Sequence, residues 1–374
     1  MLDYRSDTMT RPTAPMRRAM AEAEVGDDVF QEDPTVRALQ DQVAEMLGKE
    51  AALYLPSGSM SNQIAVLVHC RPGDEFLCEA GCHIYNYEQG AFAQLGGVVA
   101  RTLPGQHGIL HPDQFQDTIR PDDAHYVRTR LVCLENTHNR GGGRIQPYEN
   151  VAAICRWARD NRLAAHLDGA RLFNAVVATG IAAADWAAHF DTVSVCFSKG
   201  LGAPVGSALA GPRCLIEQAH RRRKCLGGGM RQAGIIAAGA LYALEHHVSR
   251  LAEDHQHAAQ LAGAIHQIPG LWLPVQEVDT NIVIFEVDPC IATAKQFVEQ
   301  LRRLGLLMLP VAPTRVRAVT HLGLPPTAAV KAASILRQAV ATCTATAEKT
   351  EEKTTCEETG KEISVDPSPI TKDL

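Results

Sequence analysis

The sequence predicts an α/β protein with a mostly parallel sheet, followed by a smaller α+β domain. Short apolar runs alternate with helix-like stretches as far as residue 270, which is typical of a parallel sheet covered by helices on both faces. After residue 270 the order changes to strand, helix, strand, strand and helix. With 374 residues, 46% hydrophobic and 21% charged, the chain is predicted to be globular, which excludes collagen-like and fully disordered classes.

The elements of the large domain follow in order along the chain. Asp33 and Pro34 begin a helix that Gly48 ends, and Val36 and Val43 lie on its apolar face. Fully apolar runs then predict the strands, which are separated by helical stretches such as 150–161. The predicted strands are 98–103, 131–134, 163–167, 192–197 and 207–210.

The small domain follows with two predicted helices and three predicted strands. Its helices are expected at 292–304 and 328–342, and its strands at 281–287, 306–311 and 315–321.

The composition changes near residue 344. The last 31 residues hold eight acids and four lysines but few apolar side chains, which predicts a disordered acidic tail. The expected organisation is therefore an N-terminal arm at 1–30 that contributes to the site and to an interface, a large domain at 31–270, a small domain at 271–343 and a tail at 344–374.

The chain shows no signal for a membrane or a secretory route. Its longest apolar stretch, 235–244, is far shorter than the roughly 20 residues that cross a bilayer. The first residues include Asp3 and Asp7 and lack the apolar core of a signal peptide, so we expect a cytoplasmic protein.

The 11 cysteines are scattered, and those within apolar runs, such as Cys133 and Cys196, are expected to be buried reduced thiols. A metal site is also not expected. Cys70, Cys78 and Cys82 show no C-x2-C pair, and Cys82 directly precedes His83, so the two side chains would point in different directions on a helix.

Lys199 is the first candidate for chemistry, because an apolar strand leads directly into it and glycines follow. A lysine that loses hydration in an apolar setting has a lowered pKa and becomes a nucleophile toward carbonyl groups. The alternative is a lysine that extends to water at a strand end, and this segment alone does not separate the two interpretations.

Asp168 also follows a predicted buried strand. The carboxyl ends of neighbouring parallel strands face one crevice, so Asp168 and Lys199 can share a site. A lysine that forms a Schiff base, with a carboxylate on the pyridinium nitrogen, is what pyridoxal 5'-phosphate requires.

Two segments could hold a phosphate group. Gly58 and Ser59 lie at the predicted start of a helix, where backbone N–H groups can meet an anion, although a Ser-Gly-Ser segment is more often a plain helix cap. The basic run 220–224 could bind nucleic acid, but its residues fan around a helix, no aromatic residues interleave and the net charge is −6. We expect a mostly solvated face, with Lys224 and Arg231 as candidate phosphate contacts.

Several motifs together resemble the low-specificity L-threonine aldolases (L-allo-threonine aldolases). The resemblance extends over about residues 2–340, in order and without large gaps, and leaves out the tail. The motifs are Asp3-x-Arg5-Ser6-Asp7-Thr8, Val25-Gly26-Asp27-Asp28-Val29, Asp33-Pro34-Thr35, Pro56-Ser57-Gly58-Ser59, Leu134-Glu135-Asn136-Thr137-His138-Asn139, His166-Leu167-Asp168-Gly169-Ala170-Arg171, Ser198-Lys199-Gly200-Leu201-Gly202 and Gly227-Gly228-Gly229-Met230-Arg231-Gln232.

This resemblance implies a pyridoxal-phosphate enzyme of fold type I, with a large domain like that of aspartate aminotransferase. It implies a homotetramer, a dimer of dimers, that cleaves L-threonine and L-allo-threonine to glycine and acetaldehyde. The implied roles are Lys199 for the Schiff base, Asp168 for the ring nitrogen, His83 for stacking on the ring, His125 for the substrate hydroxyl, Gly58 and Ser59 for the phosphate, Lys224 and Arg231 for the phosphate of a neighbouring subunit, and Ser6, Arg171 and Arg317 for the substrate carboxylate.

The general base for the substrate hydroxyl stays open between His83, His125 and bound water, because a stacked imidazole presents its face and not a lone pair. The sequence also departs from the commonest bacterial pattern at Phe30, where a tyrosine is frequent, and in the glycine-rich loop 140–144, so substrate preference is open. Two alternatives remain: another fold-type-I lyase or aminotransferase acting on a small β-hydroxy or β-substituted amino acid, and a non-catalytic module that binds an anionic polymer through 221–224.

Overall fold

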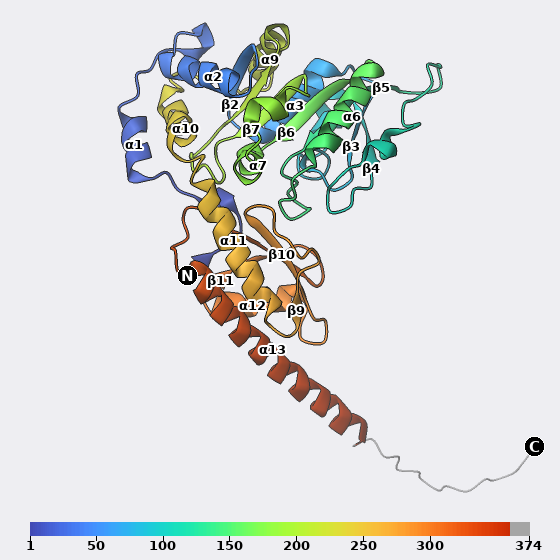
Figure 1. The fold of residues 1–374 in the computed structure, drawn as a ribbon, viewed down its shortest axis with the longest axis vertical. Coiled ribbons are helices and arrows are strands. Elements are labelled where there is room, and N and C mark those ends of the chain that lie inside the picture. The colour runs from blue at the N-terminus through green and yellow to red at the C-terminus, as the bar shows by residue number, and fades with distance from the viewer. Residues whose placement is uncertain (360–374) are drawn as a thin grey trace, which may run out of the picture.

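The computed structural model describes residues 1–359, with side chains described as far as residue 346. Its large domain contains a seven-stranded sheet in the order β2-β8-β7-β6-β5-β3-β4 (Figure 1). β8 runs antiparallel to β2 and β7, and the remaining pairs are parallel, so the prediction of a mostly parallel sheet is confirmed. The strands are β2 (Ala51–Leu55), β3 (Asp74–Glu79), β4 (Val99–Leu103), β5 (Arg128–Glu135), β6 (Ala164–Gly169), β7 (Thr192–Cys196) and β8 (Ser207–Gly211).

The sequence patterns missed two of these strands, β2 and β3. β2 begins with two alanines, which favour helices in sequence-based assignment. β3 is charged at three of its six positions, yet it is fully buried because Asp74 pairs with Arg128 and Glu75 pairs with Arg120. The other strands were predicted from their apolar residues. β3 lacks this pattern, because ion pairs with arginines allow its acidic residues to be buried.

Helices cover both faces of the large sheet, because successive strand residues point to opposite sides. On β2, Tyr54 packs in the larger core with α2 and α10, whereas Leu53 and Leu55 pack with α3 and α9. The helices of this domain are α1 (Ala14–Ala21), α2 (Pro34–Met46), α3 (Gly58–His69), α4 (His83–Asn86), α5 (Ala91–Gly96), α6 (Tyr148–Asp160), α7 (Leu172–Thr179), α8 (Ala183–Ala187), α9 (Arg213–Cys225) and α10 (Gly234–His246).

The small domain packs a four-stranded antiparallel sheet, in the order β12-β13-β10-β9, against three helices. Its core includes Ala258, Leu261 and Ile265 of α11, so this core begins before the predicted domain boundary at residue 271. The predicted strand 306–311 is divided into β11 and β12, which belong to different sheets. The elements are α11 (Leu251–His266), β9 (Leu271–Trp272), β10 (Ile282–Val287), α12 (Ala294–Arg303), β11 (Leu306–Leu307), β12 (Leu309–Pro310), β13 (Arg315–Val319) and α13 (Ala328–Thr359).

The N-terminal arm connects the two domains. β1 (Leu2–Asp3) pairs in parallel with β11, and Tyr4 lies in the small-domain core. The arm then passes the carboxyl end of the large sheet, where the Thr10 hydroxyl donates to the carbonyl of Lys199 at 2.9 Å, before α1 packs against α10. The first ten residues are therefore held beside the end of β7.

The predicted onset of disorder at residue 344 needs correction, because α13 continues as a helix to Thr359 (Figure 1). Alanine, glutamate and lysine favour helices, and a helix that is already packed extends more easily than a new one forms. The remainder of the predicted tail, 360–374, lies outside the described residues. Within the described part, no helix is both long and apolar enough to cross a membrane.

Candidate active site

The carboxyl ends of β5, β6 and β7 lie side by side at one edge of the sheet, and this region is called the crevice below. Glu135 pairs in register with Asp168, and Asp168 pairs with Ser194 of β7. Lys199 follows β7 by three residues and is half-buried. Its amine makes no hydrogen bond to any group that the structure describes, so it is available at the end of the sheet.

Asp168 is buried and held as a carboxylate. Its Oδ2 accepts from Asn62 Nδ2 at 2.8 Å, and its Oδ1 accepts from the backbone N–H of Ala170 at 3.1 Å. Burial alone would raise the pKa of Asp168, but the charges of His83 and Lys199 and the Asn62 hydrogen bond lower it below its ordinary value. The group is therefore suited to hold a protonated ring nitrogen.

His83 begins α4 and lies beside the same crevice. Its backbone N–H donates to Glu135 Oε2 at 2.6 Å, and its Nδ1 lies 2.9 Å from Glu88 Oε1. Burial lowers the pKa of His83, but the Glu88 hydrogen bond and the charge of Asp168 outweigh burial, and the net shift is upward. The imidazolium form is thus favoured.

The start of α3 forms a cradle for an anion. Ser57 caps the helix by accepting from the N–H of Met60, while Gly58 and Ser59 form the first turn, where free N–H groups and the helix dipole favour negative charge. A Cβ atom on Gly58 would lie 3.5 Å from the Ser207 hydroxyl, which is buried and has no hydrogen-bond partner among the described residues. An unpaired buried hydroxyl beside free N–H groups fits a phosphate.

Two arginines lie at the other side of the crevice. Arg171 Nε and Nη2 each donate to the Asp7 carboxylate at 2.7 Å, and both side chains are buried. Arg317 Nη1 donates to Asn139 Oδ1 at 3.0 Å, and Arg171 Nη1 points to the same oxygen at 3.4 Å. Arg317 Nε is buried without a partner in the described chain, which leaves a donor for an incoming carboxylate.

Ser6 lies at the start of the short helix Asp7–Met9, where its hydroxyl accepts from the N–H of Thr8 at 3.2 Å. It directly precedes Asp7, so the arm brings it to the arginines. This completes the predicted residues that a single chain brings together: Ser6, Gly58, Ser59, His83, Asp168, Arg171, Lys199 and Arg317.

His125 is not at this crevice within one chain. It lies three residues before β5, whose eight residues span about 25 Å, whereas the crevice lies at the other end of that strand. The His125 side chain is 88% exposed and is paired with Asp123 at 2.6 Å. Any contact with a substrate would therefore have to come from another copy.

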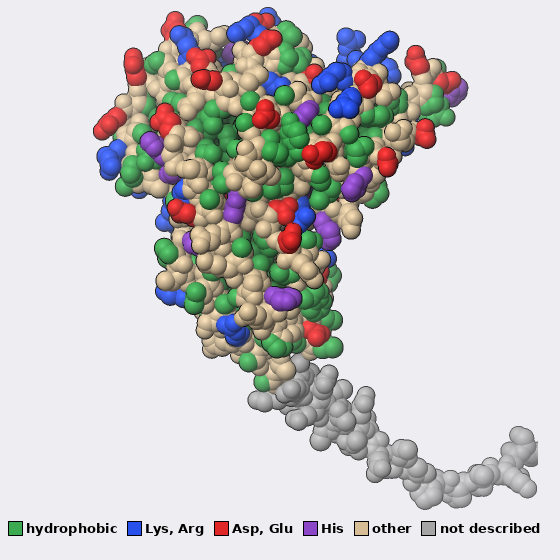
Figure 2. Space-filling view, viewed as in Figure 1, with side chains coloured by type: hydrophobic (Ala, Val, Ile, Leu, Met, Phe, Trp, Pro, Cys, Tyr) green, Lys and Arg blue, Asp and Glu red, His purple; other side chains and the backbone are tan. Residues whose placement is uncertain are grey.

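Lys224 and Arg231 are also exposed. Lys224 lines a pocket of about 370 Å³ with Val29 and Gly229, and Arg231 pairs with Asp27 at 2.8 Å. Among the described residues, neither forms a hydrogen bond or an ion pair with the start of α3. Arg223, from the same basic run, is instead buried and paired with Asp28 at 2.9 Å, so this run is not one solvated face. Acidic and basic side chains are intermixed on the surface in Figure 2.

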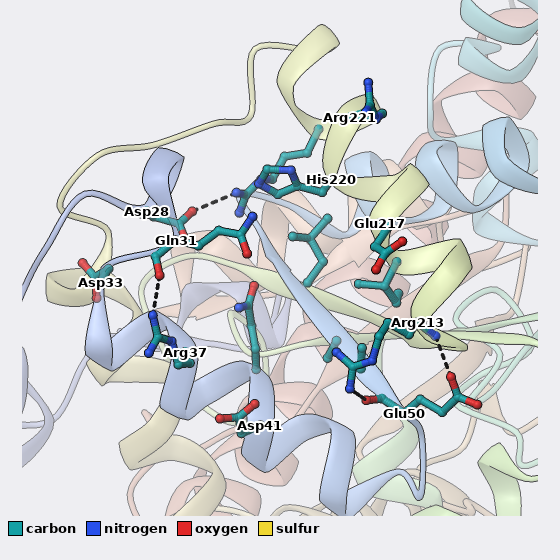
Figure 3. A pocket seen from close by; sticks show the side chains of 16 residues that line it. Asp28, Gln31, Asp33, Arg37, Asp41, Glu50, Arg213, Glu217, His220 and Arg221 are labelled. Atoms are coloured by element: carbon teal, nitrogen blue, oxygen red, sulfur yellow. Dashed lines mark hydrogen bonds and ion pairs between the residues drawn. The ribbon is translucent and has the colours of Figure 1, made fainter.

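A separate polar pocket of about 600 Å³ lies between α2, β2 and α9 (Figure 3). Residues 51–53, at the beginning of β2, line it, whereas α3 and its cradle follow the end of β2. Arg223 and Asp28 form an ion pair in its lining, whereas the Arg213 guanidinium donates to the backbone carbonyl of Glu50. Neither Asp168 nor Lys199 lines this pocket, so it is distinct from the crevice that holds them.

Four residues that shape the crevice received no role from the sequence. Asp7 and Asn139 lie within the motifs quoted above, Asn62 follows the predicted phosphate cradle at Gly58 and Ser59, and Glu88 lies in none of these segments. One available signal was the polar run 61–63, all buried, inside the otherwise apolar helix α3. Polar side chains on a buried helix face indicate a hydrogen-bonded network.

Several known proteins are similar to this chain in sequence or in fold. Residues 3–289 match the family model described as beta-eliminating lyase. The chain is 42% identical over 325 residues to low-specificity L-threonine aldolase 1 of Arabidopsis thaliana, covering 86% of this chain and 91% of that relative. It is 44% identical over 323 residues to the low specificity L-threonine aldolase of Escherichia coli (strain K12), covering 86% and 94%. The fold is similar to that of a threonine aldolase of Leishmania major, with a TM-score of 0.78 at 19% identity, covering 91% of this chain and 100% of that one.

Proposed function

The chain belongs to the low-specificity L-threonine aldolases of the beta-eliminating lyase family, and from this premise we propose that it cleaves L-threonine and L-allo-threonine to glycine and acetaldehyde. It is a carbon–carbon lyase that depends on pyridoxal 5'-phosphate and has fold type I. One observation carries the proposal: Lys199 and the ionised Asp168 share one crevice with the free helix start at Gly58.

The residues present fit the cofactor. Lys199 would hold it covalently, Asp168 would bind the ring nitrogen and His83 would face the ring. The N–H groups at Gly58 and Ser59 would hold its phosphate, with the unpaired Ser207 hydroxyl beside them. When bound, the cofactor supplies a protonated ring that accepts electrons from a bond breaking at Cα.

Arg317 and Arg171 bind the substrate carboxylate. Arg171 is already bidentate with Asp7, so its remaining edge at Nη1 faces the crevice, while Arg317 offers Nη1 and the unpaired Nε. Charge-assisted hydrogen bonds from two fixed guanidinium groups orient the substrate, so that its Cα–Cβ bond can be aligned for cleavage.

The proton of the substrate hydroxyl must leave to a base. His83 is suited to hold the ring and not to take this proton, because an imidazole stacked on the ring presents its face and not a lone pair. We therefore assign the base to bound water or to His125 of a neighbouring copy.

We further propose a homotetramer, in which Lys224 and Arg231 contact the cofactor phosphate of a neighbouring subunit. Their exposure and the exposed Phe30, 69% accessible, support a covered surface in the assembly. A cytoplasmic location, with a role in threonine breakdown and glycine formation, agrees with the ten unbridged cysteines of the described chain.

A direct assay tests the proposed activity. The purified protein, supplied with cofactor, is incubated with each L-diastereomer of threonine, and glycine and acetaldehyde are measured. Equimolar glycine and acetaldehyde are expected. A keto acid in place of these products would overturn the proposal and favour a β-eliminating lyase or an aminotransferase.

Replacing Arg317 with leucine is expected to raise KM for L-threonine by roughly 10- to 100-fold, because charge-assisted hydrogen bonds are each worth about 1.5–3 kcal/mol. The matched control is Arg315→Leu on the same strand, which loses an ion pair with Glu286 at 2.7 Å but no crevice contact. Equal KM values for the two variants would remove Arg317 from substrate binding.

His125→Phe is expected to lower kcat on both diastereomers if His125 reaches a neighbouring site, because an imidazole near the hydroxyl assists proton transfer by at least about tenfold. The assay is steady-state kinetics, with His111→Phe, a histidine near the start of α6, as the control. An unchanged kcat would assign the proton to water alone.

A further inference from the structure

Glu88 is a buried acid beside the crevice that the proposed mechanism does not use. It lies between α4 and α5 and is about 5% exposed. Its Oε1 accepts from Asn62 Nδ2 at 2.9 Å and lies 2.9 Å from His83 Nδ1, while its Oε2 accepts from Gln63 Nε2 at 2.5 Å. Burying a carboxylate is energetically costly unless it is hydrogen-bonded. Glu88 is hydrogen-bonded at both oxygens, so it can fix the orientation of its partners.

Asn62 links Glu88 to Asp168. Its Nδ2 donates one hydrogen to Glu88 and the other to Asp168, while its Oδ1 lies 3.1 Å from His166 Nε2. Both neighbours of Nδ2 are carboxylates, which only accept, so the amide has one possible orientation. One nitrogen or oxygen atom from each of His83, Glu88 and Asp168 lies within 4.8 Å of the others.

The hydrogen bonds continue from Asn62 to two histidines, His166 and His69. Burial lowers the pKa of His166 to about 4, so this histidine is neutral, and it must carry its proton on Nε2 to donate to Asn62. Its Nδ1 lies 3.0 Å from the Thr192 hydroxyl, which can donate to it, and 3.2 Å from the Thr192 carbonyl, and the Thr192 hydroxyl lies 2.9 Å from His69 Nε2. His69 is also neutral, because burial lowers its pKa to about 4.

We propose that Glu88 and Asn62 are positioning residues that hold the His83 imidazole and the Asp168 carboxylate as one unit, so that the first can face the cofactor ring and the second can reach its nitrogen. The identity of the ring rests on the proposed function, whereas the network itself belongs to this chain. All donors along it point toward the two carboxylates, so Glu88 keeps a proton on His83 Nδ1 and fixes the plane of that imidazole. Asn62 fixes the separation between Glu88 and Asp168.

The electrostatic surroundings of His83 come from four elements. Glu88 faces it from the segment after α4, Asp168 from β6, Lys199 from the segment after β7, and Glu135 from the end of β5 through the His83 backbone. Among the described side chains, Glu88 is the one that hydrogen-bonds the His83 imidazole directly, so its removal is expected to change the pKa of His83 most.

The first test measures the protonation of His83 in the full-length chain without added cofactor. The rate at which diethyl pyrocarbonate modifies His83 is followed against pH by peptide mass spectrometry. The wild-type midpoint is expected above that of the same peptide in urea-denatured protein. Glu88→Gln is expected to lower the midpoint by about one pH unit or more, because a charge partner within hydrogen-bond distance is lost.

Two further variants separate positioning from structure. Glu88→Asp keeps the charge and is expected to restore part of the shift. Glu79→Gln breaks another buried carboxylate–histidine pair, with His138 at 2.8 Å, and is expected to leave the His83 midpoint unchanged. A wild-type midpoint at the denatured value, or a Glu88→Gln variant that only melts at a lower temperature, would overturn the assignment of Glu88.

The second test concerns Asn62. Asn62→Leu, which keeps the approximate volume but removes the donors, is expected to weaken cofactor binding about tenfold in a titration of visible absorbance, since the Asp168 carboxylate loses its fixed partner. Ser61→Ala, a neighbouring buried change on α3, is the control and is expected to bind the cofactor as the wild type does. Equal affinities for the two variants would contradict the role of Asn62, whether or not threonine proves to be the substrate.

Discussion

Replacement of Lys199 by alanine is expected to abolish both the visible absorbance of the bound cofactor and the cleavage of L-threonine. We assign the nucleophile to the amine of Lys199, which lies at the carboxyl end of the sheet near Asp168, and alanine has no amine to replace it. We expect kcat to fall by about three orders of magnitude or more, equivalent to roughly 4 kcal/mol of lost transition-state stabilisation. Absorbance spectra and single-turnover assays at matched protein concentration measure the two effects.

Lys49→Met is the matched control for this variant. Lys49 is another partly buried lysine, whose amine donates to the carbonyl of Phe190 at 2.6 Å away from the crevice. Its loss is expected to lower stability without changing the absorbance. A Lys199→Ala protein that retained the wild-type spectrum and turnover would refute the assignment of Lys199.

Asp7→Asn is expected to destabilise the fold by about 3–5 kcal/mol and to raise KM for the substrate. Asp7 and Arg171 form a fully buried bidentate pair, and removing one charge leaves the other uncompensated. Asp7 also accepts from Asn281 Nδ2 at 3.2 Å, so it joins the N-terminal arm to the small domain at the crevice. Loss of the pair would free the Arg171 guanidinium to turn away from the substrate carboxylate.

The pH dependence of stability gives a second measure of Asp7→Asn. Burial would raise the pKa of Asp7, but Arg171 and Lys199 lower it well below its ordinary value. As the pH falls, Asp7 is therefore protonated in the unfolded chain before it is protonated in the folded chain. Its stabilisation of the fold is fully present above the pKa of the unfolded chain and is lost as the pH falls toward the pKa of the folded chain. The variant lacks this contribution, so its stability is expected to decline less between about pH 5 and about pH 3.

Urea unfolding at several pH values measures both effects. Asp3→Asn, which breaks a more exposed pair with Arg5, is the control and is expected to cost at most about 1 kcal/mol. Equal losses of stability with equal pH dependence in the two variants would contradict the claim that the buried Asp7–Arg171 pair stabilises the fold more than the exposed Asp3–Arg5 pair does.

The fold could be predicted from the sequence because its strands are locally recognisable. The runs that became β5, β6 and β7 are apolar and buried on both faces, so each was evident from its own residues. β3 was missed because its acids are neutralised by Arg120 and Arg128, partners distant in sequence. The onset of the tail was misplaced because composition does not show how far a packed helix will continue.

The sequence by itself indicated the class of chemistry: a lysine and an aspartate at the ends of neighbouring predicted strands can share a pyridoxal-phosphate site, and the resemblance to the low-specificity L-threonine aldolases favoured this interpretation over a lysine that extends to water. Only the tertiary structure decided how these groups are held. Glu88, Asn62 and Asp7 act through partners 26, 106 and 164 residues away, and such pairing depends on how the sheet and the arm are brought together in space. The same geometry separates His125 from the crevice, because residues at opposite ends of one strand cannot meet within a single chain.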